Sequence, residues 1–452
     1  MHQIEQIFIN GEFVTPHGTE WFDLYNPATA QVIGQVRLAD EVDAGRAIAA
    51  LKRMHAAVVA RHDDLLEAIV EEYGAPASRS AWMARYPAEV IAQAIEALEA
   101  FEFETTAGAA TVQMTPLGVA GLITPWNSDA GFICGKLAVA LAAGCTAVIK
   151  PSEMSALQTR IVTEALRDAA LPPGVFNIVT GRGETVGDTI SRHPDVAKIS
   201  FTGSTNTGKA ILRNAAESFK RVTLELGGKS PTILLDDVDL AQAIPLVIQA
   251  GFMNSGQACV AGTRILVPQS RKAEIETALA QAVAAVKSGD PRDSATDVGP
   301  MVSEKQWLRV QGYIRQGLDG GARLLAGGEG RPADTQDGWF VRPTLFADVN
   351  NDMVIARDEI FGPVLCIIPY QDEAEAIAIA NDTEYGLSAM VLGEDVERAR
   401  RVAQQIVSGR VLVNTLAHEP KAPFGGFKHS GVGREMGEWG IRAFMEPRSI
   451  LG

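Results

Sequence analysis

The sequence predicts an α/β protein with two parallel-sheet domains, because short apolar strands alternate with helices along most of the chain. One alternating series ends near residue 235, and a second begins at residue 239. Strands joined by helices of this length form right-handed βαβ units in a parallel sheet. The chain has 452 residues, too many for one ordinary hydrophobic core, so at least two domains are expected.

Composition and charge indicate a globular protein of the cytoplasm. Hydrophobic residues make up 46% of the chain and charged residues 21%, which is typical of soluble domains. The formal net charge of -15 disfavours a nucleic-acid partner, whose phosphates require a basic face, and also disfavours anionic membranes. The N-terminus lacks the features of a signal peptide, and the longest apolar run, residues 137–149, is too short to span a bilayer.

The four cysteines form neither a disulfide framework nor a metal site. Their spacings match no zinc pattern, and none of them forms a C-x-x-C pair. So few cysteines in a long chain favour a reducing compartment. The positions are Cys134, Cys145, Cys259 and Cys366.

The first hundred residues predict a hairpin followed by helices. Asn10-Gly11 lies between two short apolar pieces, which is a hairpin signal. Asp40 is a candidate N-cap, and residues 41–103 are rich in helix formers, with a break at Gly74-Ala75-Pro76. We expect this segment to be a scaffold of packed helices.

The two α/β series follow in order. The first comprises a strand pair in 111–123 interrupted at Pro116-Leu117-Gly118, then strands 146–150, 175–179, 196–201, 221–226 and 232–235, with helices 130–143, 155–169, 184–192 and 205–217. The second comprises helices 239–253, 271–287, 303–319, 373–381 and 395–407, with glycine-rich turns at 320–330 and strands 263–267, 342–347, 364–369, 388–392 and 410–414. Parallel sheets of this kind bind ligands at the carboxyl ends of their strands.

Two motifs at such strand ends suit a nucleotide. Gly203, Ser204 and Gly208 lie in a strand-to-helix turn whose N–H groups could hold a phosphate. The spacing from Gly203 to Lys209 fits a P-loop, but Ala210 stands where its magnesium ligand belongs, and the G-x-G-x-x-G fingerprint is also absent. A plain strand–helix turn is an equal alternative. In Lys150-Pro151-Ser152-Glu153, lysine and glutamate could bond ribose hydroxyls, although a solvated ion pair is the commoner interpretation on spacing alone.

Three further residues could carry chemistry. Cys259 stands among small residues that would let a substrate approach its thiol, although a lone cysteine of this kind is more often buried for packing. Glu225 lies between leucines at a strand end, where loss of water would raise its pKa and suit a general base. Asn127 could donate to an oxyanion. Glu225 could instead be a strand residue that faces water, and Asn127 could be an ordinary turn asparagine.

Taken together and in order, these segments resemble the aldehyde dehydrogenase superfamily. The motifs are Pro125-Trp126-Asn127, Lys150-Pro151-Ser152-Glu153, Phe201-Thr202-Gly203-Ser204 with Gly208, Leu224-Glu225-Leu226-Gly227-Gly228, Gly256-Gln257-Ala258-Cys259, Glu359-Ile360-Phe361-Gly362-Pro363 and Pro423-Phe424-Gly425-Gly426. Each motif is weak alone, but seven in order are specific, and Glu225 precedes Cys259 by the family's usual 34 residues.

The resemblance implies the chemistry. Cys259 would be the nucleophile that forms a thiohemiacetal and then a thioester, and Asn127 would help to hold the oxyanion. Glu225 would activate water to release the acid, unlike in the coenzyme-A-acylating branch, which lacks this base. NAD is the expected cofactor because Glu153 would repel a 2′-phosphate, although Lys150 leaves NADP open. The cofactor would be bound by Trp126, Lys150, Ser152, Glu153, Gly203, Ser204, Gly208, Glu359 and Phe361.

The resemblance also implies an architecture and a substrate tunnel. Two Rossmann-like domains are expected, a cofactor-binding domain (1–100 and 117–228) and a catalytic domain (229–424), with a small β bridging element (101–116 and 440–452) that would join subunits into a homodimer or homotetramer. Ser128, Gly131, Phe132 and Gly135 share one helix face that would line the tunnel with Val260. The two glycines and the serine would make the tunnel wide, which predicts a bulky aldehyde such as an aromatic one. The alternatives are a non-catalytic family member and a P-loop-like nucleotide hydrolase, which Ala210 disfavours.

Overall fold

The computed structural model describes residues 41–335 and 337–451 and the backbone of five strands between residues 2 and 37; side chains are described from residue 49 onward. Three of the five strands form a sheet in the order β1-β5-β4, and β2 pairs with β3. The antiparallel β2–β3 pair confirms the predicted hairpin, whose Asn10-Gly11 turn lies, like Asp40, outside the described residues. The bounds are β1 His2–Ile4, β2 Ile7–Ile9, β3 Glu12–Val14, β4 Trp21–Asn26 and β5 Gln31–Arg37.

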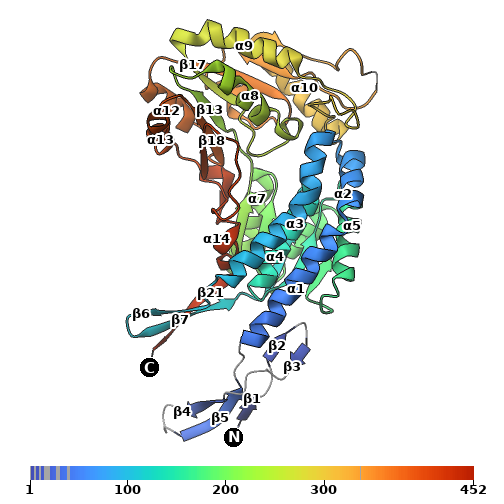
Figure 1. The fold of residues 1–452 in the computed structure, drawn as a ribbon, viewed down its shortest axis with the longest axis vertical. Helices are drawn as coiled ribbons and strands as arrows, with labels where there is room; N and C mark the ends of the chain where they lie inside the picture. Colours follow the sequence, from blue (N-terminus) through green and yellow to red (C-terminus); the bar gives the residue numbers. More distant parts are fainter. Residues whose placement is uncertain are drawn as a thin grey trace.

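The predicted helical stretch is divided into α1 (Glu41–Val59), α2 (His62–Ala68), a π-helical turn (Ile69–Tyr73) and α3 (Ala77–Glu99). The predicted break occurs at Gly74, where φ is 76°. A second break, after α1, falls at Ala60-Arg61, where there is no glycine or proline to signal it in the sequence. Figure 1 shows α1 and α3 lying side by side along one lobe.

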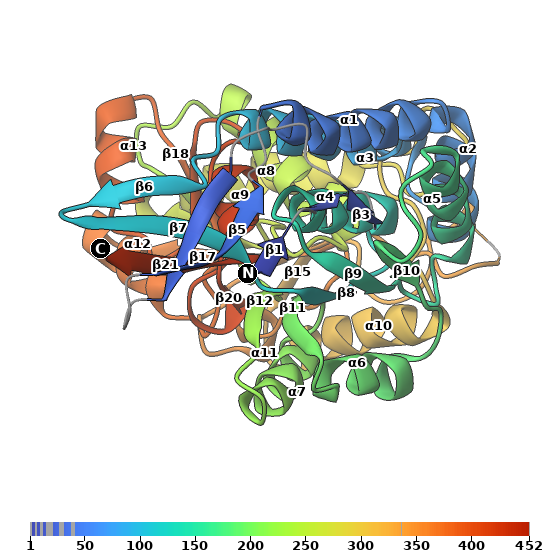
Figure 2. The ribbon, with the colours of Figure 1, turned by 90° about the horizontal axis from the view of Figure 1, so that it is seen from below.

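The first lobe is built on a six-stranded sheet in the order β10-β9-β8-β11-β12-β20. All its pairs are parallel except β12–β20. Helices α1 to α5 cover one face and α6 and α7 cover the other, as Figure 2 shows. The bounds are β8 Val119–Ile123, β9 Thr146–Lys150, β10 Phe176–Ile178, β11 Val196–Thr202, β12 Arg221–Glu225, β20 Gly431–Val432, α4 Asp129–Ala142, α5 Ala156–Asp168, α6 Asp188–Arg192 and α7 Thr205–Ala216.

The second lobe is built on a seven-stranded sheet in the order β15-β16-β17-β14-β13-β18-β19, parallel except for β15. Alternate residues of its strands pack against α8 and α9 on one face and against α10 to α13 on the other. Strand β15 lies within the stretch that was predicted as glycine-rich turns. The bounds are β13 Pro231–Leu234, β14 Arg264–Pro268, β15 Arg323–Ala326, β16 Thr344–Ala347, β17 Val364–Tyr370, β18 Ser388–Leu392, β19 Arg410–Val413, α8 Leu240–Gly251, α9 Lys272–Ala285, α10 Glu304–Asp319, α11 Val354–Arg357, α12 Glu373–Asn381 and α13 Val396–Ala403.

A third, antiparallel sheet in the order β21-β7-β6 extends from the first lobe (Figure 1). It consists of β6 (Glu104–Ala107), β7 (Ala110–Pro116) and β21 (Met445–Leu451), which follows helix α14 (Gly437–Arg442). The sequence predicted one strand pair in 111–123. Instead β7 and β8 belong to different sheets, because Pro116 ends β7 and Gly118, with φ 114°, redirects the chain.

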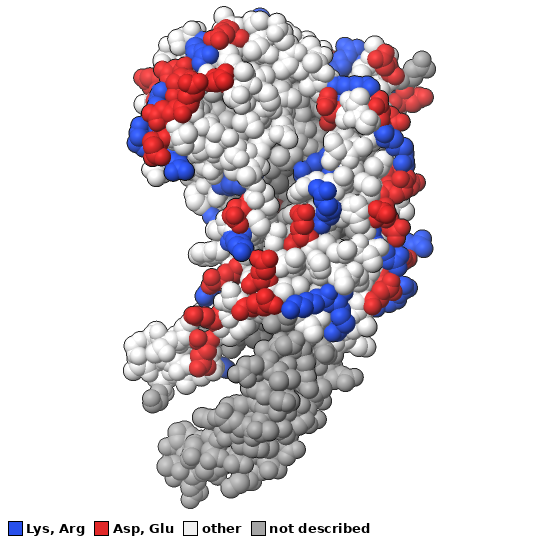
Figure 3. Space-filling model, in the orientation of Figure 1, with Lys and Arg blue, Asp and Glu red and all other residues white. Residues whose placement is uncertain are grey.

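Acidic and basic side chains alternate along the outer edges of both lobes on the face that Figure 3 displays. No helix in the described part of the chain is long and apolar enough to cross a bilayer.

Candidate active site

The loop that carries Cys259 is held in a strained shape by close packing. It follows a 3₁₀ turn (Met253–Gly256) in which Asn254, Ser255 and Gly256 all have positive φ, at 53°, 59° and 75°. A β-carbon on Gly256 would lie 2.2 Å from the backbone carbonyl carbon of Gly362. Only glycine fits there, so the Gly256 motif packs directly against the Gly362 motif.

The glycine pair after Glu225 brings two further segments to the same place. A β-carbon on Gly228 would lie 2.3 Å from the Cys259 carbonyl oxygen, and one on Gly227 would lie 2.5 Å from a carboxylate oxygen of Glu359. The N–H of Gly228 donates to Glu359 Oε1 at 2.9 Å. These two glycines therefore join the end of β12, the Cys259 loop and the Glu359 loop.

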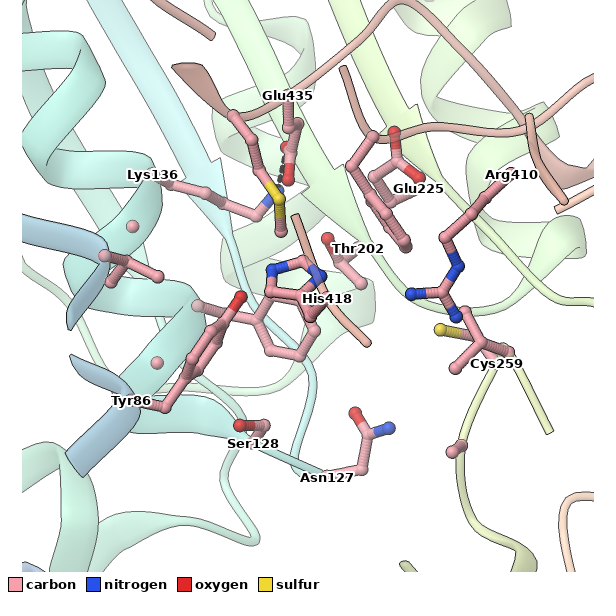
Figure 4. Close-up of a pocket in the computed structure, with 18 of the residues that line it drawn as sticks. Tyr86, Asn127, Ser128, Lys136, Thr202, Glu225, Cys259, Arg410, His418 and Glu435 are labelled. Carbon is pink, nitrogen blue, oxygen red and sulfur yellow. Dashed lines mark hydrogen bonds and ion pairs between the residues drawn. The ribbon is translucent and has the colours of Figure 1, made fainter. Parts of the chain in front are cut away.

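Cys259, Glu225 and Asn127 line one cavity of about 260 Å³. Figure 4 shows it at close range. All the residues predicted for the substrate tunnel line it as well, namely Ser128, Gly131, Phe132, Gly135 and Val260. The rest of its wall is mainly apolar and includes Trp82, Val90, Met253, Leu412, Leu416 and Phe424.

The surroundings of the Cys259 thiol in the cavity favour its neutral form. Burial raises its pKa to about 12, and the nearby carboxyl groups of Glu359 and Glu225 add to the shift, while Arg410 opposes it. Burial also raises the pKa of the other three cysteine thiols. None of those three lines the cavity, and all are buried and free of disulfides.

Glu225 ends β12 and is buried, at 3% exposure. Neither of its carboxyl oxygens has a hydrogen-bond partner among the described residues. Burial raises its pKa well above the usual value, and the neighbouring Glu435 raises it further. A buried carboxyl group that makes no hydrogen bond beside a cavity can exchange a proton with a molecule bound there.

The amide of Asn127 is fixed at the same cavity. Its Nδ2 donates to the Gln257 backbone carbonyl oxygen at 3.0 Å, and the backbone carbonyl oxygen of Asn127 accepts a 3.4 Å hydrogen bond from Asn254 Nδ2. The first bond uses one amide hydrogen and leaves the second for another acceptor. The backbone N–H of Cys259 donates to no acceptor among the described residues.

The predicted phosphate and ribose residues lie at one edge of the first sheet. Ile123 of β8 is in register with Lys150 of β9 and with Phe201 of β11, so these strands end at the same level. Lys150 Nζ lies 3.0 Å from Glu153 Oε2, and Ser152 Oγ accepts from the Met154 N–H at 3.2 Å. Just beyond this edge, the turn from Gly203 leads into α7.

Helix α7 is capped and tightly packed. Ser204 is its N-cap and accepts from the Thr207 N–H at 3.3 Å. Gly208, which has no side chain, packs directly against Leu226. A β-carbon at position 208 would lie 2.6 Å from that leucine. The N–H of Gly203 donates to the Glu225 carbonyl oxygen at 3.0 Å. The turn that begins at Gly203 is thus hydrogen-bonded directly to the backbone of Glu225, the candidate base.

Two aromatic residues from opposite lobes meet beside this edge. The rings of Trp126 and Phe361 pack edge to face with centroids 5.5 Å apart. Next to them, Glu359 is half-buried, and burial raises its pKa to about 7 while the Gly228 N–H lowers it. Trp126, from the same lobe as Lys150 and Ser204, is therefore in contact with Phe361 of the other lobe, two residues after Glu359.

The structure corrects the physical reason that the sequence suggested for a wide tunnel. A β-carbon on Gly131 would lie 2.5 Å from the ring of Tyr86, and one on Gly135 would lie 3.6 Å from Val90. Both neighbours belong to α3. The glycines therefore let α3 approach α4 closely, and the space they leave is filled by protein rather than by substrate.

Sequence reasoning missed several residues of the cavity wall, namely Tyr86, Lys136, Arg410, His418 and Glu435. Lys136 follows Phe132 by four residues on one helix face, which is a signal that could have found it. It pairs with Glu435 and donates to Ser200 Oγ at 2.9 Å. Tyr86 and His418 come from distant segments of the chain, α3 and the loop that follows β19.

The comparison with known families places this site in context. The chain matches the model of the aldehyde dehydrogenase family over residues 13–450. The chain belongs to the aldehyde dehydrogenase family. A relative from Staphylococcus haemolyticus is 44% identical over 473 residues, which cover all of this chain and 99% of the relative.

Solved aldehyde dehydrogenase structures share the fold. An alanine variant of aldehyde dehydrogenase C from Pseudomonas syringae, in complex with NAD+ and octanal, is 42% identical with a TM-score of 0.87 and covers 99% of this chain and 96% of its own. The Mycobacterium tuberculosis enzyme in complex with NAD+ is 39% identical with a TM-score of 0.86, covering 99% of this chain and 98% of its own. The predicted family and α/β fold are therefore confirmed.

Proposed function

We propose that this aldehyde dehydrogenase oxidises a bulky aldehyde to its carboxylic acid with NAD+, using Cys259 as nucleophile and Glu225 as general base. The observation that carries the proposal is that the thiol, a buried carboxyl group without a hydrogen-bond partner and a fixed amide line one cavity. The NAD+ in two related structures supports the cofactor.

In the first step, the Cys259 thiol gives its proton to the deprotonated carboxylate of Glu225, which passes it on to solvent, and the sulfur attacks the carbonyl carbon as a thiolate. A carbon–sulfur bond forms, and the carbonyl electron pair moves onto oxygen. The free hydrogen of the Asn127 amide and the Cys259 backbone N–H are the donors for that oxygen. Loss of one such donor costs roughly 3 kcal/mol of transition-state stabilisation in comparable sites.

In the second half of the reaction, the acyl group is released from sulfur. Glu225 takes a proton from water as the water attacks the thioester, the carbon–sulfur bond breaks, and the acid leaves. The buried position of Glu225 raises its pKa and makes it a stronger base than an exposed glutamate. A thiol suits this route because a thioester is readily hydrolysed.

The residues at the sheet edge fit a dinucleotide. The N–H groups at the start of α7, which Ser204 caps, suit a pyrophosphate. Lys150 and Glu153 can bond one ribose and Glu359 the other, and Ser152, Gly203, Gly208, Trp126 and Phe361 complete the site. When bound there, NAD+ would supply the acceptor for the hydride that leaves the substrate carbon as the thioester forms. Glu153 favours NAD+ over NADP+ by repelling a 2′-phosphate.

The size and wall of the cavity support a bulky substrate. About 260 Å³ of mainly apolar space exceeds what acetaldehyde would fill. Octanal in the related Pseudomonas enzyme is consistent with a long apolar substrate.

The proposed reaction also assigns roles to the parts of the chain. Residues 1–100 and 117–228 would bind the cofactor, and residues 229–424 would carry out catalysis. The β21-β7-β6 sheet, from 101–116 and 440–452, would pair subunits in a dimer or tetramer.

One assay tests the proposal. NADH formation is followed at its absorbance maximum with a panel from acetaldehyde to octanal and benzaldehyde, for the wild type and Cys259→Ala. We expect activity with bulky aldehydes and none in the variant. Equal activity in the variant would reject the nucleophile, and a strong preference for acetaldehyde would reject the bulky substrate.

A further inference from the structure

Arg410 stands beside the candidate nucleophile on an edge strand of the second sheet. It opens β19 and is in register with Ser388 of β18, whose Oγ accepts a 3.2 Å hydrogen bond from Arg410 Nε. Gly409, immediately before it, packs so closely on Gly425 that a β-carbon at position 409 would overlap the Gly425 carbonyl oxygen. Figure 4 shows the guanidinium on this support next to the Cys259 thiol, in the wall of the same cavity.

No carboxylate in the described part of the chain neutralises the charge of Arg410. Its two terminal nitrogens form neither an ion pair nor a hydrogen bond with a described residue, and the guanidinium lies 5.9 Å from the centre of the Phe424 ring. Arg410 also lines a second, small cavity of about 10 Å³, where the other polar side chains are neutral hydroxyls, those of Ser230, Thr232 and Ser388. The half-buried charge is therefore available to balance a thiolate.

The thiol needs such a charge because its other ionisable neighbours disfavour the thiolate. Burial, together with the carboxyl groups of Glu359 and Glu225, raises the pKa of Cys259 to about 12, and Arg410 is the charged group that opposes this rise. Tyr86 also lies near the thiol, but burial raises the pKa of its hydroxyl, which stays neutral. A cation at this place makes the thiolate easier to form.

The other basic groups of the cavity wall are engaged elsewhere or neutral. Lys136 pairs with Glu435, so its charge is balanced within the protein. Arg79 stacks on an aromatic ring of its own helix, 3.9 Å from the ring centre. Loss of water around the ring of His418, and then the charge of Arg410, lower the pKa of that histidine, so it is neutral at neutral pH. Arg410 is thus the cation placed to act on the sulfur.

Resting on the proposed aldehyde oxidation, we propose that Arg410 stabilises the thiolate of Cys259 and so activates the nucleophile of this chain. The proton of the thiol goes to Glu225, and Arg410 neither gives nor takes one. The guanidinium balances the negative charge that the sulfur carries between its deprotonation and its attack on the carbonyl carbon. Arg410 acts through Cys259 and not on the substrate, so its effect is the same for every aldehyde.

The test measures how fast Cys259 is alkylated by iodoacetamide, a neutral reagent that reacts with the thiolate. Below the pKa of a thiol, each unit by which that pKa rises lowers the thiolate fraction, and with it the rate, about 10-fold. In Arg410→Gln we expect alkylation at about pH 8 to be roughly 10- to 100-fold slower, the effect that a neighbouring charge has in a partly buried site. Arg410→Lys keeps the charge and should stay within about 3-fold of the wild type. Mass spectrometry of the peptide that contains Cys259 follows the reaction.

Iodoacetate, which carries a carboxylate, distinguishes stabilisation of the thiolate from binding of an anion. A defect of Arg410→Gln with iodoacetate but not with iodoacetamide would overturn the proposal, because Arg410 would then attract the reagent. An equal defect in Arg410→Gln and Arg410→Lys would also overturn it, since the shape of the side chain and not its charge would matter. Arg400→Gln removes a charge from the exposed surface of α13 and is the matched control, which should react at the wild-type rate.

Alkylation needs neither aldehyde nor cofactor, so it separates this proposal from the proposed reaction. Slow alkylation of Arg410→Gln together with a wild type that forms no NADH would overturn the oxidation and leave the activation standing. Alkylation of Arg410→Gln at the wild-type rate would overturn the activation alone. With an active wild type, kcat/KM for octanal and for benzaldehyde should fall by one common factor in Arg410→Gln. A loss confined to one aldehyde would contradict an action through Cys259.

Discussion

Gly228 lies so close to Cys259 that a β-carbon at position 228 would stand 2.3 Å from the Cys259 carbonyl oxygen. The same glycine donates its N–H to Glu359 Oε1 at 2.9 Å. One residue, three positions after the candidate base, thus sets the place of the candidate nucleophile and of a predicted cofactor carboxylate. The motif that contains Glu225 and the motif that contains Cys259, which are separated along the chain, are therefore in direct contact in the fold.

Substitution of this glycine should disturb the site more than the fold. In Gly228→Ala the added methyl group forces the Cys259 backbone to move, and a displacement of about 1 Å can cost roughly 100-fold in rate. We expect kcat to fall by about that factor, measured as NADH formation, with a smaller change in melting temperature. Gly312→Ala is the control, because nothing lies within 4 Å of a β-carbon there. Its helix α10 should become more stable by about 0.5–1 kcal/mol.

Glu225 should give the reaction a pH dependence. Its pKa is raised by burial, so the carboxyl group loses its proton at a higher pH than an exposed glutamate, and only the deprotonated form is a base. The rate of thioester hydrolysis should therefore rise with pH through that pKa. In Glu225→Gln the rise should vanish and the rate should fall by about 100-fold or more. Single-turnover release of acid between pH 5 and 9 measures both; an unchanged profile in the variant would exclude the base.

Asn127 should affect kcat more than KM, because in the proposed reaction its free amide hydrogen stabilises a charge that develops only during the chemical step. Asn127→Ala should lower kcat by roughly 100- to 1000-fold. Steady-state kinetics with one bulky aldehyde separates the two constants. A variant with normal kcat and a raised KM would show that the amide binds substrate rather than the oxyanion.

Asp129 should make the stability of the fold depend on pH. It is buried at 0% exposure and accepts hydrogen bonds from the Thr124 and Thr159 hydroxyls at 2.6 and 3.0 Å. Burial nevertheless raises its pKa from 3.8 to about 7. The folded state therefore holds this proton more tightly than the unfolded state, and the stability it contributes is fully present below about pH 4 and lost as pH rises to about 7.

Asp129→Asn should remove this loss, which corresponds to about 4 kcal/mol. Melting temperatures from pH 5 to 8 provide the measurement. We expect the variant to gain stability relative to the wild type as pH rises. A constant difference between the two proteins across this range would contradict the shifted pKa.

The alternation of strands and helices was predictable from the sequence because each element carries its own signal. Strand 146–150, for example, is an apolar run ended by a proline, and it forms β9 with the same bounds. The sheet edge that joins Lys150 and Gly203 followed from the rule that parallel strands end together.

What the sequence could not predict depends on contacts between distant segments. Tyr86 fills the space beside Gly131, but no local pattern on α3 indicates this. Arg410 opens an apolar strand and would be read as a solvated residue without knowledge of the cavity. The second break in the early helices carries no glycine or proline. These features arise from packing between elements rather than from the elements themselves.

The most direct test of the central claim is to trap the acyl group on the nucleophile. Glu225→Gln is mixed with NAD+ and benzaldehyde, quenched in acid, digested and analysed by mass spectrometry. The account predicts that the peptide containing Cys259 gains the mass of one benzoyl group, while the peptides containing Cys134, Cys145 and Cys366 do not. A benzoyl group on another residue, or NADH formation with no covalent adduct at any time, would contradict it.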